Sequence, residues 1–296
     1  MKKWFEKLSK TAKIGMITGA VAIVAVVAVV LILVLGNKEE AYRNIRVNEV
    51  TGEVYVNRDG LDGLKVSANM NLQSGDEIIT EKGARLTLRL DDDKYIIMDE
   101  ASKMKLHATG TAEDSKTRLE LEYGAVFSDI KNKLSAQSSY NVVTPTSTMS
   151  VRGTQLEVVY RMVYDEAGEV QGAEIKTVTY EGVVLVEVEG MEETQTLEVG
   201  DVVEIKEEKA AEGEKPKVVV ETRKIEAKDL NEYAVEYLKE SLSDSANEGQ
   251  LTETQKAVQQ ELLQMVEEYI AENKSEPTPE PTATPEPTAT PAPTAT

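Results

Sequence analysis

An uninterrupted apolar run near the start of the chain constrains its folding more than any other feature. From Ile14 to Leu35 there is no charged residue. At about 1.5 Å per helical residue, such a run crosses the hydrocarbon core of a bilayer, which is about 30 Å thick. The tail before it is rich in lysine, whereas two of the first three charged residues after it, Glu39 and Glu40, are acidic. The excess of positive charge predicts a cytoplasmic N-terminus. We expect a basic tail at 1–13, a transmembrane helix at 14–36, and an extracytoplasmic remainder at the cell membrane.

A cleaved signal peptide is the alternative interpretation of this run. Its apolar length exceeds the usual 7 to 15 or so residues of a signal-peptide core, and no A-x-A-like cleavage site closes it. An uncleaved single-pass anchor is therefore favoured. A mature N-terminus near Ala41 would instead indicate cleavage.

The composition excludes several kinds of site. The chain has no cysteine, which removes disulfides, thiolate metal ligands and a cysteine nucleophile, and it has one histidine, His107. A net charge of −20 argues against nucleic acid as a partner, because phosphate binding needs clustered Lys and Arg. Aromatic residues make up only 5% of the chain. The core must therefore consist mainly of Val, Leu and Ile, which favour strands.

Residues 45–207 show short alternating runs punctuated by Gly and Asp, such as GEVYVNRDG and GVVLVEVEG. Strands at this spacing predict a mainly β domain of short antiparallel strands, arranged as a sandwich or a coil of hairpins. An internal repeat lies within it: G-E-V-Y-V from Gly52 with L-Q-S-G-D-E-I from Leu72 matches G-V-V-L-V from Gly182 with L-E-V-G-D-V-V from Leu197. Positive φ is expected at Gly75 and Gly200, and backbone hydrogen bonds to Asp76 and Asp201. A structural role of these aspartates is favoured over a metal or catalytic one.

The C-terminal third differs from this domain. Residues 208–224 are expected to be a linker and a short strand, and residues 225–273 two amphipathic helices, the second opened by the capping box that begins at Thr252. The helices are expected to pack as a hairpin or on the β domain, rather than to bind a partner. Residues 274–296 form a Pro/Thr repeat that predicts a disordered, extended spacer.

The stretch TPTSTMSVRGTQLEVVY, from Thr144 to Tyr160, is the most specific motif in the chain. It resembles the T-P-x(5)-V-R-G-T-x-[FL]-x-V hallmark of FecR-family extracytoplasmic domains. The order of the weaker motifs upstream, including L-x-x-G-D-x-I-x-T from Leu72 to Thr80, follows the same family's layout. The resemblance covers about Val47 to Glu207 and leaves the helices and the Pro/Thr tail unexplained.

The motif residues are expected to be structural. Thr144 and Pro145 begin a segment that is extended before the proline, and the four residues of the V-R-G-T sequence predict a tight turn held by its glycine. Arg152 is expected to clamp a carboxylate or carbonyls, with ligand binding as the alternative. These turn residues are Val151, Arg152, Gly153 and Thr154.

The chain departs from the family pattern in two places. Asp91, Asp92 and Asp93 stand where many members have a D-G-S turn. A solvated acidic turn is favoured there over a calcium site, because calcium needs six to eight oxygen ligands. The family's cytoplasmic anti-sigma domain is also lacking, since only a short tail precedes the span, so direct sequestration of a sigma factor is not expected.

We expect a non-enzymatic binding or sensing module of the bacterial cell envelope, since no residue pattern predicts a catalytic, cofactor or metal site. The partner would be an envelope protein or a glycan. A structural cell-surface spacer without signalling is the alternative, and a glycan hydrolase using paired carboxylates is a third and weaker one. The sequence does not predict the oligomeric state.

Overall fold

The computed structural model describes residues 43–151, 153–209, 217–245 and 252–273. The expected tail and span at 1–36, Arg152 and the Pro/Thr repeat lie outside these ranges. Among the helices within them, none combines the length and apolarity that a membrane span requires. The chain divides into two compact units between Ile225 and Glu226.

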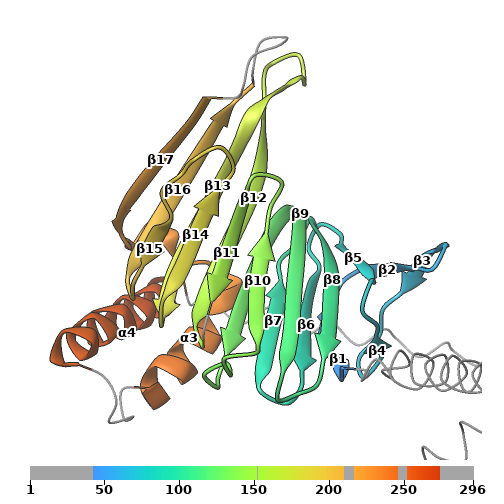
Figure 1. Ribbon diagram of the computed structural model, residues 1–296, viewed down its shortest axis with the longest axis horizontal. Coiled ribbons are helices and arrows are strands. Elements are labelled where there is room, and N and C mark those ends of the chain that lie inside the picture. Colours follow the sequence, from blue (N-terminus) through green and yellow to red (C-terminus); the bar gives the residue numbers. More distant parts are fainter. Residues whose placement is uncertain (1–42, 152, 210–216, 246–251, 274–296) are drawn as a thin grey trace, which may run out of the picture. The chain divides into compact units, whose positions relative to one another are not determined.

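The described residues of the first unit form strands and their connections (Figure 1). In chain order these are β1 (Ile45–Thr51), β2 (Val54–Arg58), β3 (Leu61–Lys65), β4 (Asn71–Leu72), β5 (Glu77–Thr80), β6 (Arg85–Leu90), β7 (Lys94–Met98), β8 (Ser102–Gly110), β9 (Ser115–Ile130), β10 (Ser139–Val143), β11 (Ser147–Val151), β12 (Gln155–Tyr164), β13 (Val170–Glu181), β14 (Val184–Val188), β15 (Gln195–Leu197), β16 (Asp201–Glu208) and β17 (Lys217–Lys224).

These strands form two ladders that share β9. In the first ladder the order is β3-β2-β5-β8-β9-β10-β11-β14-β15. In the second it is β4-β1-β6-β7-β9-β12-β13-β16-β17. Residues 115–123 of β9 pair in the first ladder, and residues 124–130 pair in the second. One strand therefore links both ladders by continuous backbone.

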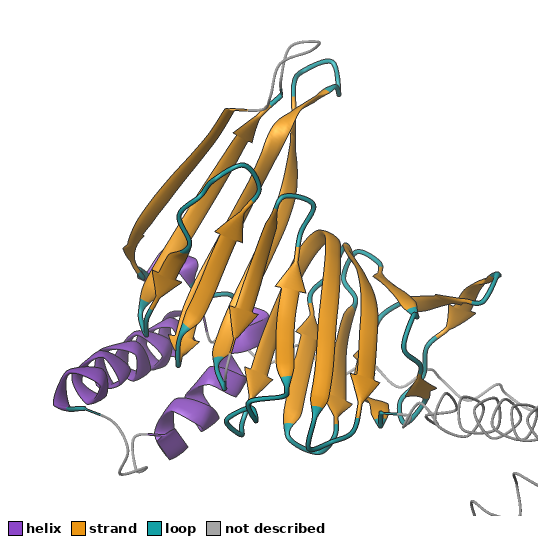
Figure 2. Ribbon diagram, in the orientation of Figure 1, coloured by secondary structure: helices purple, strands orange, loops and turns teal. Residues whose placement is uncertain are grey.

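The alternation of buried side chains turns one face of each ladder toward a common core. Val56, Leu106 and Val186 come from the first ladder, and Leu88, Val158 and Ile205 from the second, and all belong to one buried cluster. Each of these side chains is fully buried. The mainly β architecture predicted from the sequence is confirmed, and it takes the form of a sandwich (Figure 2).

Gly124 marks the point where β9 leaves one ladder for the other. Its φ is +97°, and the β8–β9 register shifts next to it, between Lys103 and Met104. A Cβ atom at this position would overlap Ser102. The Ser102 hydroxyl lies close by, because it accepts a hydrogen bond from the Ala125 N–H at 2.9 Å. The crossing therefore needs a residue without a side chain.

Two details differ from the sequence prediction. The pairing of β9 with β10 is parallel, because the chain leaves β9 in the second ladder and returns to run beside its first half. The segment expected to be a linker with a short strand supplies β17, which pairs with β16 over its full length and so extends the second ladder. The β unit thus continues to Ile225 rather than ending at 207.

The second unit contains a short 3-10 helix, η1 (Ala227–Asp229), and two α-helices, α3 (Glu232–Ser245) and α4 (Glu253–Asn273). The predicted capping box is confirmed: the Gln255 N–H donates to Thr252 Oγ1 at 3.3 Å, and the Thr252 N–H donates to Gln255 Oε1 at 3.1 Å. α3 and α4 contact each other, and Leu238, Leu262 and Val266 are buried. The two predicted helices are therefore present.

Replacing Gly124 with alanine tests the crossing. We expect Gly124→Ala to lower the free energy of unfolding by about 3 kcal/mol or more, since positive φ costs about 1 to 2 kcal/mol and the overlap with Ser102 adds to it. Gly168→Ala is the matched control, because Gly168 also has positive φ (+82°) but no heavy atom within 4 Å of the added Cβ. Urea unfolding of the full-length protein in detergent measures both. An equal loss of unfolding free energy in the two variants would show that the crossing does not require a glycine at position 124.

Candidate functional site

The two L-x-x-G-D turns of the repeat share the same hydrogen bonds. Gly75 and Gly200 have the predicted positive φ, +99° and +80°. The Gln73 N–H donates to the Asp76 carboxylate at 2.8 Å, and the Glu198 N–H donates to the Asp201 carboxylate at 2.9 Å. A basic side chain completes each turn, Arg58 at 2.6 Å from Asp76 and Lys224 at 2.7 Å from Asp201. The Gly-Asp pairs Gly75–Asp76 and Gly200–Asp201 therefore both lie in hydrogen-bonded turns.

The strands that follow these turns pair differently. β5 returns to β2 within the first ladder, whereas β16 joins β13 in the second. The two copies of the repeat therefore share the geometry of the turn, but the strands that follow the turns belong to different ladders.

The T-P segment forms the hairpin loop between β10 and β11. The Thr144 N–H donates to the Ser147 carbonyl at 2.9 Å, and the Ser147 N–H donates to Thr144 Oγ1 at 3.1 Å. Pro145, which is exposed, and Thr146, which is half-buried, form the end of this loop. The Glu189 N–H donates to the Thr146 carbonyl at 2.8 Å, which ties the loop to the connection between β14 and β15.

The V-R-G-T segment is the turn between β11 and β12. Val151 is buried in the core, Gly153 has a φ of +78°, and Thr154 Oγ1 donates to the Val183 carbonyl at 3.3 Å. A Cβ atom on Gly153 would lie 2.9 Å from Lys133 Cα. The positive φ of Gly153 agrees with the predicted turn, while Arg152 lies outside the described ranges and its expected role stays a prediction.

A cavity of about 410 Å³ lies where these loops meet the end of β14. Its walls come from the T-P loop, from β11 and β14, and from the polar connection at 189–194. They offer hydroxyls, carboxylates and a few apolar side chains: Val143, Thr144, Pro145, Thr146, Ser147, Thr148, Glu187, Val188, Glu189, Met191, Glu192, Glu193 and Thr194. The volume lies in the range of small-ligand pockets, about 300 to 1,000 Å³. The most specific sequence motif of the chain therefore borders a cavity.

The electrostatic character of this cavity is negative. Glutamates line it, and no basic residue of the described chain does. The neighbouring Glu207, on β16, has a pKa raised by burial and further by the charge of Glu189, while the Thr146 side chain opposes the shift. The glutamates of the described lining therefore have no basic residue beside them within that lining. Such a cavity favours a cationic group, or a ligand rich in hydrogen-bond donors.

The hydroxyls in the cavity walls are not arranged as nucleophiles. Thr144 Oγ1 and Ser147 Oγ lie 2.8 Å apart and bond each other rather than a base. His107 lies elsewhere, on β8, with Nε2 3.5 Å from Glu120. The geometry therefore supports binding, and a non-enzymatic role stays a prediction.

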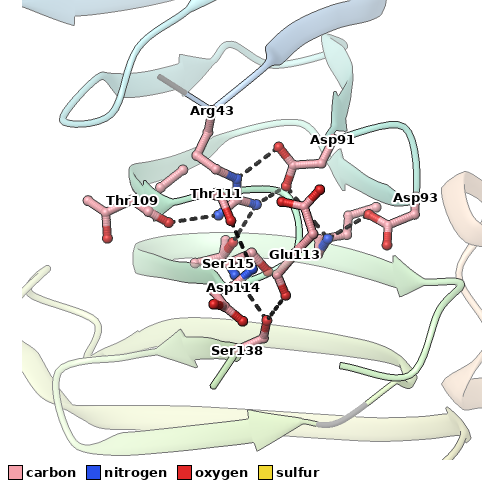
Figure 3. A network of polar contacts seen from close by, with 12 residues as sticks. Arg43, Asp91, Asp93, Thr109, Thr111, Glu113, Asp114, Ser115 and Ser138 are labelled. Carbon is pink, nitrogen blue, oxygen red and sulfur yellow. Dashed lines mark hydrogen bonds and ion pairs between the residues drawn. The ribbon is translucent and has the colours of Figure 1, made fainter. Parts of the chain in front are cut away.

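The acidic turn between β6 and β7 differs from the expectation of a solvated loop. Asp91 is buried and forms a paired ion contact with Arg43, in which Nε of the arginine donates at 2.8 Å (Figure 3). Lys94, also buried, lies 2.5 Å from Asp93. Only Asp92 fits the prediction, since its side chain is 77% exposed. Asp91 and Asp92 replace the family's glycine by adopting positive φ themselves, which aspartate tolerates.

The same arginine reaches a second loop. Arg43 Nη1 donates to the Thr109 carbonyl at 3.0 Å, near the loop that Ser138 closes by accepting from the Ser115 N–H and donating to the Glu113 carbonyl (Figure 3). Arg43, Lys94 and Arg89 thus form ion pairs with the carboxylates of the acidic turn. In the described part of the chain, no three His, Asp or Glu side chains come together as a metal site.

Comparison with known proteins was made for sequence and structure. Residues 76–185 match the family model described as FecR protein. This stretch includes Asp76, the acidic turn, the T-P loop and the V-R-G-T turn. It therefore bears out the family resemblance for this part of the chain. No curated protein matches.

Two solved structures are similar in part. Both are crystal structures of a protein described as a proposed anti-sigma factor from Parabacteroides distasonis ATCC 8503, at 1.65 and 2.50 Å resolution. The first has a TM-score of 0.36 and 16% identity, over 50% of this chain and 60% of the other. The second has a TM-score of 0.36 and 14% identity, over 56% and 72%. This chain thus spans less than two thirds of the first structure.

Sequence reasoning missed two parts of these sites. The connection at 189–194, with sequence EGMEET, carried only a turn-like composition. Its place beside the T-P loop follows from the β11–β14 pairing, a long-range contact without a local pattern. Arg43 was missed because it lies in a polar segment that resembles any surface linker.

Removing the buried arginine tests the ion-pair cluster. We expect Arg43→Met to lower the free energy of unfolding by about 3 to 5 kcal/mol, because it leaves the buried Asp91 carboxylate without its main partner. Arg46→Met is the control, since Arg46 is exposed and bonds only Asn69 among the contacts described. Its effect should stay within about 0.5 kcal/mol. Similar effects of the two substitutions in urea unfolding would contradict the importance of the pair.

A second buried carboxylate predicts a pH-dependent stability. Asp129 accepts from Gln155 Nε2 at 3.1 Å, its other oxygen has no hydrogen-bond partner among the described residues, and burial raises its pKa. A raised pKa means that the folded state holds the proton more tightly, so stability is lost as the pH rises through that pKa. Asp129→Asn should therefore stabilise the protein at neutral pH, and the gain should vanish below the ordinary aspartate pKa.

Unfolding of Asp129→Asn and the unchanged protein across this pH range measures the effect. The comparison is Asp165→Asn, because backbone hydrogen bonds from Glu169 and its neighbours lower the pKa of Asp165. Its substitution should destabilise at neutral pH and lose its effect as the pH falls. The same sign for both substitutions would refute the assignment.

Proposed function

We propose that this chain is a single-pass, membrane-anchored sensing module of the bacterial cell envelope, which binds a partner on its extracytoplasmic β domain without catalysing a reaction. The observation that carries the proposal is that the FecR-family match at 76–185 includes the T-P loop that borders the acidic cavity. The uncharged run at 14–35 supports the anchor, and the lysines before it support a cytoplasmic N-terminus.

The cavity is the proposed binding site. Its two loops are held together by the Glu189–Thr146 hydrogen bond, so its shape does not depend on a ligand to form. A partner protein or a glycan would meet hydroxyl and carboxylate acceptors there.

A structural spacer is the second candidate. The Pro/Thr repeat from Glu276 onward favours it, because such a sequence forms an extended chain that can hold a domain away from a surface. The two candidates differ in one respect. A sensing module needs a partner at the cavity, and a spacer does not.

The absence of cysteine allows a test with single cysteines in the full-length protein. Glu113→Cys and Glu192→Cys, both at exposed positions, should react with a membrane-impermeant maleimide on intact cells. Lys7→Cys should react only after permeabilisation. Labelling of Lys7→Cys on intact cells, or failure of the other two, would contradict the proposed orientation.

The same cysteines test the binding site. A short photo-crosslinker on Glu192→Cys, at the cavity, should join a partner of defined mass that crosslinks less when Glu187 or Glu189 is changed to Gln. Glu113→Cys, away from the cavity, should not join it. Equal crosslinking from both positions, or none from either, would favour the spacer.

A further inference from the structure

The second ladder continues beyond the end of the first. Figure 1 shows β12, β13, β16 and β17 extending past β11 and β14. β12 pairs with β9 only as far as Tyr160, whereas its pairing with β13 continues to Tyr164. Arg161–Tyr164, called here the tip segment, therefore has β13 as its single neighbour among the strands that the structure describes. Its other edge is open to an added strand.

The inner face of this extension is apolar and exposed. Side chains alternate along a strand, and Leu156, Val158 and Tyr160 belong to the core, so Met162 and Tyr164 continue the same face. Met162 is 41% exposed and Tyr164 57%. The Tyr164 hydroxyl bonds the Met162 sulfur at 3.5 Å, which agrees with their lying on one face.

The same face carries an acidic side chain. Ala173 pairs with both Met162 and Glu207, which places Glu207 on the inner face two strands from the tip segment. Burial, followed by the charge of Glu207 and by Tyr164, raises the pKa of Tyr160, so these groups lie near one another. Glu189 of the cavity also acts on Glu207. The apolar patch and the acidic cavity are thus parts of one surface.

Two basic side chains of the extension lie on its other face, whereas Lys209, two residues after Glu207, continues the inner face. Arg161 and Lys206 alternate with Met162 and Glu207 along their strands. The inner face therefore combines an open strand edge, apolar side chains and carboxylates, among them Glu207. Its complement is an extended chain with apolar and basic side chains.

We propose that the tip segment binds an extended segment of a partner protein by β-strand addition. The partner's segment carries lysine or arginine side chains that interact with Glu207 and Glu189. Main-chain hydrogen bonds along the open edge supply affinity, and alternate side chains supply specificity. The inference rests on the proposed function, for which it names the class of partner.

The test uses the full-length protein in detergent and a short synthetic peptide of alternating valine and lysine, with binding followed by fluorescence anisotropy. Two control peptides separate the contribution of charge from that of main-chain hydrogen bonds. One has glutamate in place of lysine, and the other has N-methylated valines, which lack the backbone N–H. Both should bind at least about tenfold more weakly than the first. Equal binding of all three peptides would overturn the proposal.

Matched variants locate the site. Glu207→Gln should weaken binding about tenfold, whereas Glu208→Gln, its neighbour on the opposite face, should not. Met162→Ser should weaken binding, whereas Val163→Ser, similarly exposed at 38% on the opposite face, should not. Thermal melting of each variant confirms that it is folded. Equal effects within either pair would overturn the proposal.

The outcome is distinguishable from failure of the proposed function. If the peptide does not bind but Glu192→Cys still crosslinks a partner, the strand-addition proposal is wrong and the sensing module stands. If the peptide binds as expected but no partner is crosslinked at the cavity, the strand-addition proposal stands and the cavity is not the recognition site.

Discussion

The structure of the β unit depends on backbone hydrogen bonding along a single strand. β9 pairs with β8 and β10 in one ladder and with β7 and β12 in the other, so each half of it is central to a ladder. Chain segments far apart in sequence are aligned by this one strand. The change of ladder occurs at Gly124, where the backbone takes a conformation that other residues adopt only at a cost in free energy. Packing of the core depends on this crossing, because the inner faces of the two ladders face each other only if β9 passes from one ladder to the other at Gly124.

The local features of the fold could be predicted from the sequence, because they depend on neighbouring residues. Alternation gave the strands, Gly75 and Gly200 gave turns with positive φ, and Thr252 gave the start of a helix. The pairing of strands could not be predicted in the same way. β17 resembles an isolated strand after a linker, and only its pairing with β16 makes it part of the domain. The parallel pairing of β9 with β10 likewise arises from the crossing between ladders and has no sequence pattern.

The candidate site illustrates the same limit. The T-P loop was identified by its motif, but the carboxylates that give the cavity its charge come from about forty residues later in the chain, from the end of β14 and the connection at 189–194. The acidic turn was misjudged for a related reason. Three successive aspartates predict exposure when considered alone, whereas Arg43 and Lys94 make it favourable to bury Asp91. Charge balance in a folded protein is a property of contacts, and composition describes it only on average.

The position of Arg43 has a mechanical consequence. This residue stands two places before β1, and its guanidinium bonds both a carboxylate of the β6–β7 turn and a carbonyl at the end of β8. Tension applied to the chain from its N-terminal side would therefore load this ion pair before it reached the first ladder hydrogen bond of β1. Arg43 would therefore distribute a pulling force between two loops before the hydrogen bonds between β1 and its neighbouring strands are loaded.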